Sequence, residues 1–145
     1  MKKVILVCTG NTCRSPMAEG LLKQMLAAEG SADIAVSSYG IEANDGPVAA
    51  PNAIAALGHI GIDISGHQAT KLSKEAVETA DLIICMNKKH FAKIEADYPD
   101  ALQKSQIVLG DGVSDPYGES LAVYITCRDQ IKAGLQALLP AILAL

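Results

Sequence analysis

The chain has 145 residues, of which 50% are hydrophobic and 19% are charged, and its formal net charge is −4. This length and hydrophobic content predict one globular domain over residues 1–145 and argue against a disordered chain. A mildly acidic chain without a block of like charges argues against a nucleic-acid partner and against an anionic membrane surface.

The two ends of the chain carry short apolar stretches. The first covers only Val4 to Val7 before Gly10 and Asn11, which is too short for a signal peptide. The last, LLPAILAL, has eight residues, far short of the ~20 that span a bilayer. The four cysteines contain no C-x-x-C pair and lack the density of a secreted protein. We therefore expect a cytoplasmic protein with reduced thiols and no membrane partner.

In the first third of the chain, apolar runs alternate with a helical pattern. Residues 2–8 form a continuous apolar run, as expected of a central parallel strand that is covered on both faces. A helix is predicted over 15–30, with Ser15 and Pro16 at its N-cap and first position and Gly30 at its end. A second strand is predicted over 33–40, and the Gly- and Pro-rich segment 42–53 is a long loop of the kind that often carries function.

The rest of the chain continues this alternation. Helices are predicted over roughly 52–60, over 73–80 with Ser73 as its cap, over 88–97, and from about 119 to Leu139, where Pro140 disturbs the end. Strands are predicted over 81–86 and 105–110, and residues 111–120 form a turn-rich loop. The pattern predicts an α/β fold: a three-layer, doubly wound sheet of four parallel strands with helices on both faces. Ligands bind such sheets at the carboxyl ends of the strands.

The segment VCTGNTCRSPMAEG, residues 7–20, joins the first strand to the first helix. Its backbone N–H groups can turn inward beside the positive end of the helix dipole and cradle a tetrahedral oxyanion. Gly10 permits close approach of the backbone, Asn11 tolerates left-handed geometry, and Arg14 can hold two oxygens of the anion. The phosphate-binding loop is thus predicted to contain Thr9, Gly10, Asn11, Thr12, Cys13 and Ser15.

Cys8 lies at the floor of this cradle. The amide dipoles and Arg14 favour its thiolate, so we expect its pKa to lie well below the ~8.5 of a free thiol. Such a thiolate is a nucleophile for phosphoryl transfer. The segment lacks the Gly-Lys-Ser/Thr of a Walker loop, and the spacing of Cys8 and Cys13 is loose for a zinc half-site. No metal and no other cofactor is expected, because Arg14 and the amides carry the charge.

CTGNTCRSPMAE resembles the phosphate loop of the low-molecular-weight protein tyrosine phosphatase family, in which a Cys is followed by five residues and an Arg. SDPYG at 114–118 resembles the family's downstream Asp-Pro, and GIDISGHQA (61–69) and ADLIICM (80–86) stand in the family's order. The resemblance implies Cys8 as nucleophile, Arg14 as transition-state clamp and Asp115 as proton donor. Phosphorylated proteins would be the substrates. After donating its proton, the Asp115 carboxylate would activate water, and inorganic phosphate would leave from a phosphocysteine intermediate.

The resemblance further implies that Asn11, Ser38 and His67 form a polar network that braces the loop, although His67 could equally be a surface histidine. Ser15 is expected to cap the helix and to donate a hydrogen bond to the Cys8 thiolate.

Cys13 could form a reversible disulfide with Cys8 under oxidation and so protect the nucleophile from irreversible damage. The remaining cysteines and histidines are expected to lie outside the site: Cys85 and Cys127 as core thiols, and His59 and His90 as solvated residues on helices.

The residue before the second cysteine separates two branches of this family. It is usually a bulky aliphatic residue in tyrosine-directed members and threonine in protein-arginine phosphatases. Thr12 and the segment GESLAVYITCRDQI (118–131) resemble the arginine branch, whereas Tyr117 resembles the tyrosine branch. Glu42 stands where the arginine branch tends to have an aromatic residue, and it could pair with a guanidinium or face water. We expect a phosphoarginine phosphatase with Thr12, Tyr117 and Glu42 at its substrate pocket, with phosphotyrosine as the alternative substrate.

Two other functions share this scaffold. One family of arsenate reductases has the same fold and loop, and also shows GIEA and GIDIS segments, found here at 40–43 and 61–65. That chemistry needs two further cysteines in a mobile segment, and here only Cys85 lies in the matching region, within a predicted buried strand. That family also usually has Gln where Pro16 stands. A phosphate-binding module is the non-enzymatic alternative, but a binder needs no nucleophile such as Cys8.

Overall fold

Four parallel strands form the centre of the fold. The computed structural model describes residues 1–145, and its strands are β1 (Lys2–Cys8), β2 (Ile34–Gly40), β3 (Leu82–Cys85) and β4 (Ser105–Ile107). Their order in the sheet is β2-β1-β3-β4. β1 pairs along its whole length with β2, so that Cys8 lies opposite Gly40 at the carboxyl end of both strands. The predicted number and direction of the strands are therefore confirmed.

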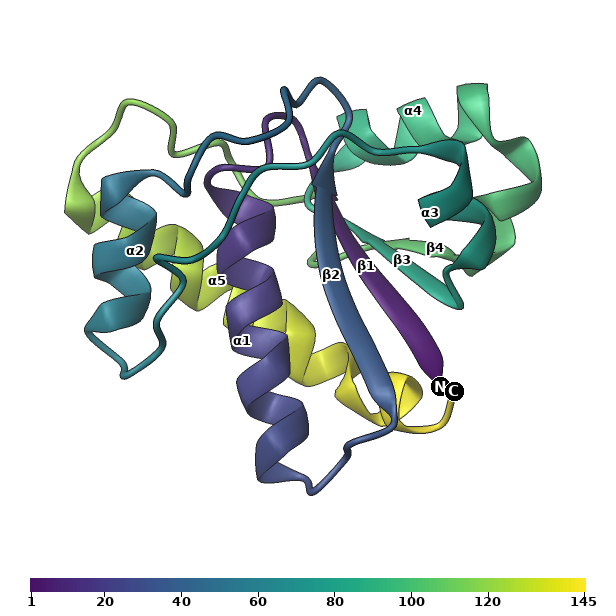
Figure 1. Ribbon diagram of the computed structural model, residues 1–145, viewed down its shortest axis with the longest axis horizontal. Helices are drawn as coiled ribbons and strands as arrows, with labels where there is room; N and C mark the ends of the chain where they lie inside the picture. Colours follow the sequence, from purple (N-terminus) through teal and green to yellow (C-terminus); the bar gives the residue numbers. More distant parts are fainter.

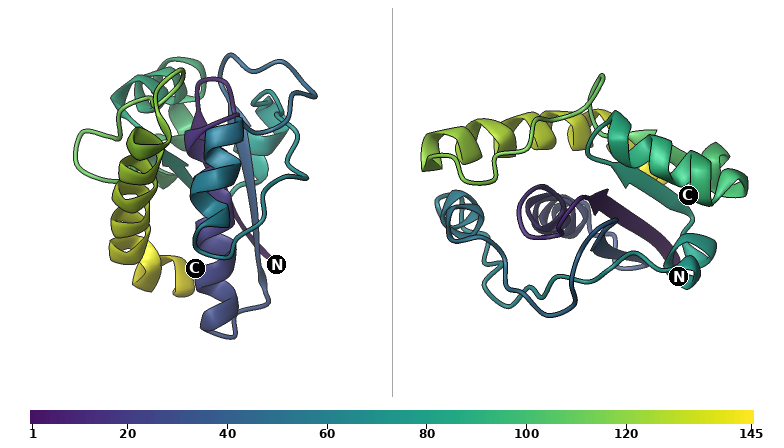
Figure 2. Two further views of the ribbon diagram at one scale, coloured as in Figure 1. Left: turned by 90° about the vertical axis from the view of Figure 1, so that its left-hand side faces the viewer. Right: turned by 90° about the horizontal axis from the view of Figure 1, so that it is seen from above.

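Helices cover both faces of this sheet (Figures 1 and 2). One face packs against α1 (Arg14–Ala28) and α5 (Leu121–Leu143), and α2 (Pro51–Gly58) packs against both of these helices. The other face packs against α3 (Lys74–Thr79), α4 (Lys88–Asp97) and the 3₁₀ helix η1 (Pro99–Lys104). Alternate residues of β1 divide between the two cores: Leu6 belongs to the first and Ile5 to the second. This is the predicted three-layer arrangement. None of the helices has the length and apolar character needed to cross a membrane.

The first helix begins earlier than the sequence predicts. Its first residue is Arg14, and Cys13 occupies the N-cap position without a side-chain capping bond. Ser15 is therefore not the N-cap, and its hydroxyl lies 2.8 Å from Cys8 Sγ instead. Pro16 is accommodated in the first turn because an N–H at that position has no intrahelical acceptor. Gly30, at φ +69°, follows the helix end as predicted.

Smaller differences concern the last elements. α5 continues through Pro140 to Leu143, because the fully buried Ile142 holds the last turn against the core. β4 ends at Ile107, short of the predicted 105–110, and Gly110 turns the chain with φ +51°. The short helix η1 was not predicted. Ser73 caps α3 as predicted, since its hydroxyl accepts a hydrogen bond from the N–H of Ala76 at 3.1 Å.

The loops that leave the strands at their carboxyl ends meet at one edge of the sheet, at the top of Figure 1. Residues 9–13 follow β1, residues 41–50 follow β2, and residues 108–120 follow β4. This edge is where the sequence predicts a ligand, and the remainder of the fold serves to hold these loops.

Candidate active site

The loop between β1 and α1 has the backbone of an anion cradle. Asn11 has φ +57° and is the only non-glycine residue with a positive φ, as its place in the loop predicts. The backbone N–H groups of Gly10, Thr12 and Cys13 have no acceptor within the protein. The N–H of Asn11 donates to Cys8 Sγ at 3.3 Å. Free donors beside the positive end of a helix dipole are suited to an oxyanion held above Cys8.

The three predicted catalytic residues line one pocket of about 220 Å³. Cys8 and Arg14 are almost fully buried, whereas about half of the Asp115 side chain is exposed. One terminal nitrogen of Arg14 lies 3.6 Å from Asp115 Oδ2, and the other donates to the carbonyl of Val113 at 3.1 Å. The other residues that line the pocket are Thr9, Gly10, Thr12, Cys13 and Tyr117.

Arg14 retains an unused donor. Its Nε is buried and has no hydrogen-bond partner, the only side-chain nitrogen or oxygen in the protein of which this is true. A buried cationic donor without an acceptor is costly, so such groups are rare and call for an explanation. An anion in the pocket would supply the missing acceptor, which supports a phosphate site at this place.

A polar network holds the loop from behind, and it contains the three residues predicted for it. The side-chain nitrogen of Asn11 donates to the hydroxyls of Ser15, at 2.8 Å, and Ser38, at 3.0 Å. Its side-chain oxygen accepts a hydrogen bond from the N–H of Thr70, and its backbone carbonyl lies 2.8 Å from His67 Nε2. His67 is thus not an isolated surface histidine, because it contacts the loop directly.

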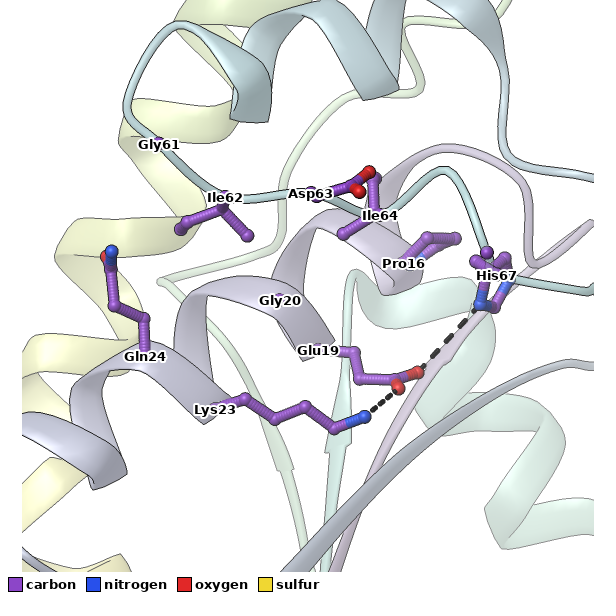
Figure 3. Close-up of a pocket in the computed structure, with 11 residues that line it drawn as sticks. Pro16, Glu19, Gly20, Lys23, Gln24, Gly61, Ile62, Asp63, Ile64 and His67 are labelled. Carbon is purple, nitrogen blue, oxygen red and sulfur yellow. Dashed lines mark hydrogen bonds and ion pairs between the residues drawn. The ribbon is translucent and has the colours of Figure 1, made fainter.

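Glu19 extends this network to a second pocket (Figure 3). Its carboxylate accepts a hydrogen bond from Ser38 at 2.6 Å, forms an ion pair with Lys23 at 2.7 Å, and lies 4.0 Å from His67 Nδ1. This second pocket, between α1 and the segment 61–67, has a volume of about 570 Å³ and is larger than the one at Cys8. It contains none of the catalytic residues, so pocket size does not identify the active site here.

His90 differs from the prediction of a solvated residue. It is fully buried, and its Nε2 lies 3.0 Å from Thr9 Oγ1. Its Nδ1 accepts a hydrogen bond from the N–H of Asn87 at 3.2 Å, while the Asn87 side chain caps α4 in return. Burial is the main cause that lowers the pKa of His90 to about 3, with a contribution from the positive charges of Arg14 and Lys89. The spacing Asn87-x-x-His90 is that of a capping box and was the signal available in the sequence.

Two of the predicted pocket residues differ in their placement. Tyr117 lies at the rim, 74% exposed, and its N–H donates to Asp115 Oδ1 at 3.1 Å. Glu42 does not line the pocket, so that prediction is wrong. Its side chain is exposed, and its contribution to the loop is through its backbone N–H, which donates to the carbonyl of Thr9 at 2.9 Å.

Gly40 supports the loop and was not singled out from the sequence. A Cβ atom at this position would lie 2.5 Å from the carbonyl oxygen of Thr9 and 2.9 Å from the backbone nitrogen of Asn11. Only glycine lets the end of β2 approach the loop this closely.

The four cysteines are free thiols, and all are buried. Cys13 Sγ lies 3.3 Å from the hydroxyl of Tyr124, and burial raises the pKa of Cys13. Cys85 and Cys127 are core thiols as predicted, and burial raises the pKa of each to about 12. A disulfide between Cys8 and Cys13 stays a prediction.

Comparison with known proteins agrees with this geometry. The sequence profile of the family described as low molecular weight phosphotyrosine protein phosphatase matches residues 3–144. A probable low molecular weight protein-tyrosine-phosphatase, EpsP of Ralstonia nicotianae, is 38% identical and is matched over 100% of this chain and 99% of its own. A protein-arginine-phosphatase of Bacillus subtilis is 36% identical over 93% of both chains. A glutaredoxin arsenate reductase of Synechocystis is 34% identical over 98% of this chain and 99% of its own.

Among solved structures, a cysteine-to-serine mutant of the YwlE arginine phosphatase with a phosphorylated active-site serine is similar, with a TM-score of 0.90 and 33% identity. The similarity covers 97% of this chain and 95% of that one. The chain therefore belongs to the low molecular weight phosphotyrosine protein phosphatase family.

Proposed function

We propose that this protein hydrolyses phosphoarginine in proteins through a phosphocysteine intermediate. The observation that carries the proposal is the pocket itself, in which Cys8, Arg14 and Asp115 surround a space of about 220 Å³ with Thr12 on its wall. A nucleophile, a cationic clamp and a carboxyl group are the parts that phosphoryl transfer without a metal requires.

In the first step, the Cys8 thiolate attacks phosphorus while the loop amides and Arg14 hold the phosphoryl oxygens. Hydrogen bonds from the N–H of Asn11 and from the Ser15 hydroxyl stabilise the thiolate. The bond between phosphorus and the guanidine nitrogen breaks, and Asp115 gives its proton to that nitrogen as it leaves. Proton donation of this kind is typically worth ~10²–10⁴ in rate.

In the second step, the ionised Asp115 takes a proton from water, which attacks the phosphorus of phosphocysteine. Inorganic phosphate leaves, and the Cys8 thiolate and the protonated Asp115 are restored. The partly exposed position of Asp115, at the mouth of the pocket, gives it access to both the leaving group and water. Phosphorylated proteins are therefore the proposed partners and inorganic phosphate the proposed product.

Thr12 favours phosphoarginine over phosphotyrosine. Its short, polar side chain lines the pocket and offers a hydroxyl that can orient a planar guanidinium, which a bulky aliphatic residue could not do. A similar protein-arginine-phosphatase of Bacillus subtilis supports this choice. The exposed aromatic ring of Tyr117 at the rim favours the alternative, a phosphotyrosine side chain, and EpsP is a relative with that assignment.

Arsenate reduction is less well supported, although one relative carries that name. After the first thiol adduct forms, reduction needs further thiols that are accessible for exchange. Cys85 is fully buried within β3, and burial raises its pKa and that of Cys127 to about 12. Both therefore stay protonated at neutral pH and are poor nucleophiles for thiol exchange.

The intermediate provides the test of the mechanism. An Asp115→Asn variant, quenched in denaturant at alkaline pH during turnover of a phosphoarginine peptide, should carry a phosphoryl group on the peptide that contains Cys8. Mass spectrometry of the digested protein measures this, with Cys8→Ala as the matched variant that lacks a nucleophile, because the active-site serine of the similar YwlE mutant carries a phosphoryl group. Labelling confined to another residue, or no labelling in any variant that turns over substrate, would contradict a phosphocysteine.

A further inference from the structure

A buried histidine on α4 contacts the active-site loop although it lies outside the pocket. His90 reaches Thr9, the residue after the nucleophile, with 3.0 Å between Nε2 and the threonine Oγ1. Thr9 lines the pocket of Cys8, whereas His90 does not. The contact joins residues that are 81 positions apart and connects α4 to the floor of the active site.

The hydrogen bonds around His90 determine which ring nitrogen carries the proton. The backbone N–H of Asn87 donates to Nδ1 at 3.2 Å, so Nδ1 must be an acceptor without a proton. A neutral imidazole in this position carries its proton on Nε2 and donates it to Thr9 Oγ1. The low pKa of about 3 that burial gives His90 keeps the ring neutral across the range in which enzymes usually work.

The direction of this hydrogen bond fixes the role of the threonine hydroxyl. One lone pair of Thr9 Oγ1 is taken by His90, and its own proton has no acceptor within the protein. Because Thr9 lines the pocket, that proton is available to an acceptor that enters it.

We propose that His90 is a positioning residue that makes the Thr9 hydroxyl a hydrogen-bond donor to an oxygen of the bound phosphoryl group. The inference rests on the proposed function, because it assigns the hydroxyl to the same phosphoryl site. The Thr9 hydroxyl would then be a side-chain donor to the phosphoryl group, in addition to the backbone N–H donors of the loop. The capping box of α4 is built on histidine, whose imidazole accepts the backbone hydrogen bond of Asn87 at Nδ1 and has a second nitrogen left to donate to Thr9.

A double-mutant cycle tests the inference. Thr9→Val removes the hydroxyl, and His90→Phe removes the donor that orients it. We expect each single variant to bind inorganic phosphate about tenfold more weakly by calorimetry, since a hydrogen bond to an anion contributes about 1.5 kcal/mol or more. Thr9→Ser should restore binding, because it keeps the hydroxyl. The double variant should bind no more weakly than either single variant, because the two residues act through one proton.

Three further measurements keep the test independent of folding and of catalysis. The nitrogen shifts of His90 in a histidine-labelled sample should show a neutral ring protonated on Nε2 from pH 8 to pH 5. His90→Gln, which can still donate to Thr9, should retain more affinity for phosphate than His90→Phe. The exposed His59→Phe is the matched control and should bind phosphate as the wild type does.

Additive losses in the double variant would overturn the inference, as would a proton on Nδ1 or full phosphate affinity in Thr9→Val. The proposed function and the role of His90 can fail independently, and the measurements distinguish the two failures. If no phosphorylated peptide is turned over but the cycle still shows coupling in phosphate affinity, the positioning role stands and the phosphatase proposal fails. If turnover depends on Cys8 but the losses are additive, the phosphatase proposal stands and the role of His90 fails.

Discussion

Replacing His90 with glutamine should make the stability of the protein less sensitive to acid. His90 is fully buried, and its pKa of about 3 lies below the ~6.5 of an unfolded histidine. Between these two values the unfolded chain binds a proton that the folded chain does not, so the free energy of unfolding falls as the pH falls. Each pH unit in this window corresponds to about 1.4 kcal/mol, so the wild type should lose about 2.5 kcal/mol between pH 7 and pH 4.5 from this residue alone.

Urea unfolding of the wild type and His90→Gln at several pH values measures this loss. We expect the difference between their free energies of unfolding to change by about 2.5 kcal/mol over that range, with the variant relatively more stable in acid. The exposed His59→Gln is the matched control and should follow the wild type. A difference that does not depend on pH would refute the reasoning, because it would mean that His90 binds its proton equally well in the folded and unfolded chains.

Substitutions at three other positions test the loop, its support and the proposed proton donor. Asn11→Ala should lower the free energy of unfolding, measured with urea, by about 2 kcal/mol or more, because it leaves buried partners unpaired and places alanine at φ +57°. Asn11→Gly should recover part of this loss in the same measurement, because glycine adopts that φ without strain. Gly40→Ala should weaken phosphate binding measured by calorimetry, because the added Cβ would displace the Thr9 carbonyl. Unchanged affinity would contradict this and show that phosphate binding does not depend on the position of that carbonyl. Asp115→Asn should reduce kcat about 10²- to 10⁴-fold for a phosphoarginine peptide, and a loss under threefold in initial rates would remove Asp115 from the role of proton donor.

The strands were predictable because a parallel strand covered on both faces reads as a continuous apolar run. Residues 2–8 show this clearly, and all five residues from Val4 to Cys8 are buried. The loop was predictable for a different reason, since Cys8, Asn11 and Arg14 each have a chemical requirement that few other residues meet. Local sequence was sufficient to predict those features that depend on neighbouring residues in the chain or on the alternation of strands and helices.

Contacts between distant segments account for most of the features that could not be predicted from the sequence. His90 follows two lysines at the start of α4, and its burial depends on the position of Thr9, 81 residues away. Gly40 reads as an ordinary strand end, and its closeness to the loop follows only from the pairing of β1 with β2. Glu42 follows the same strand, and the pattern of the chain does not show that its side chain is exposed and does not line the pocket.

The start of α1 was misplaced for a reason that concerns function. Ser15 and Pro16 have the residue types of an N-cap and a first helical position, and rules for helix ends assume that a side chain caps the helix. Here the loop ends at Cys13 without a capping side chain, so the first amides of the helix remain free beside Cys8. A helix end that is left open in this way is suited to bind an anion.

The most direct test of the central claim is a paired measurement of initial rates on phosphoarginine and phosphotyrosine peptides of the same sequence, with Cys8→Ser as the control. We predict a higher kcat/KM for phosphoarginine and no turnover of either peptide by the Cys8→Ser variant. A higher kcat/KM for phosphotyrosine would contradict the role given to Thr12 while leaving the mechanism intact. Turnover that persists without the Cys8 thiol, or no turnover of either peptide by the wild type, would contradict the account as a whole.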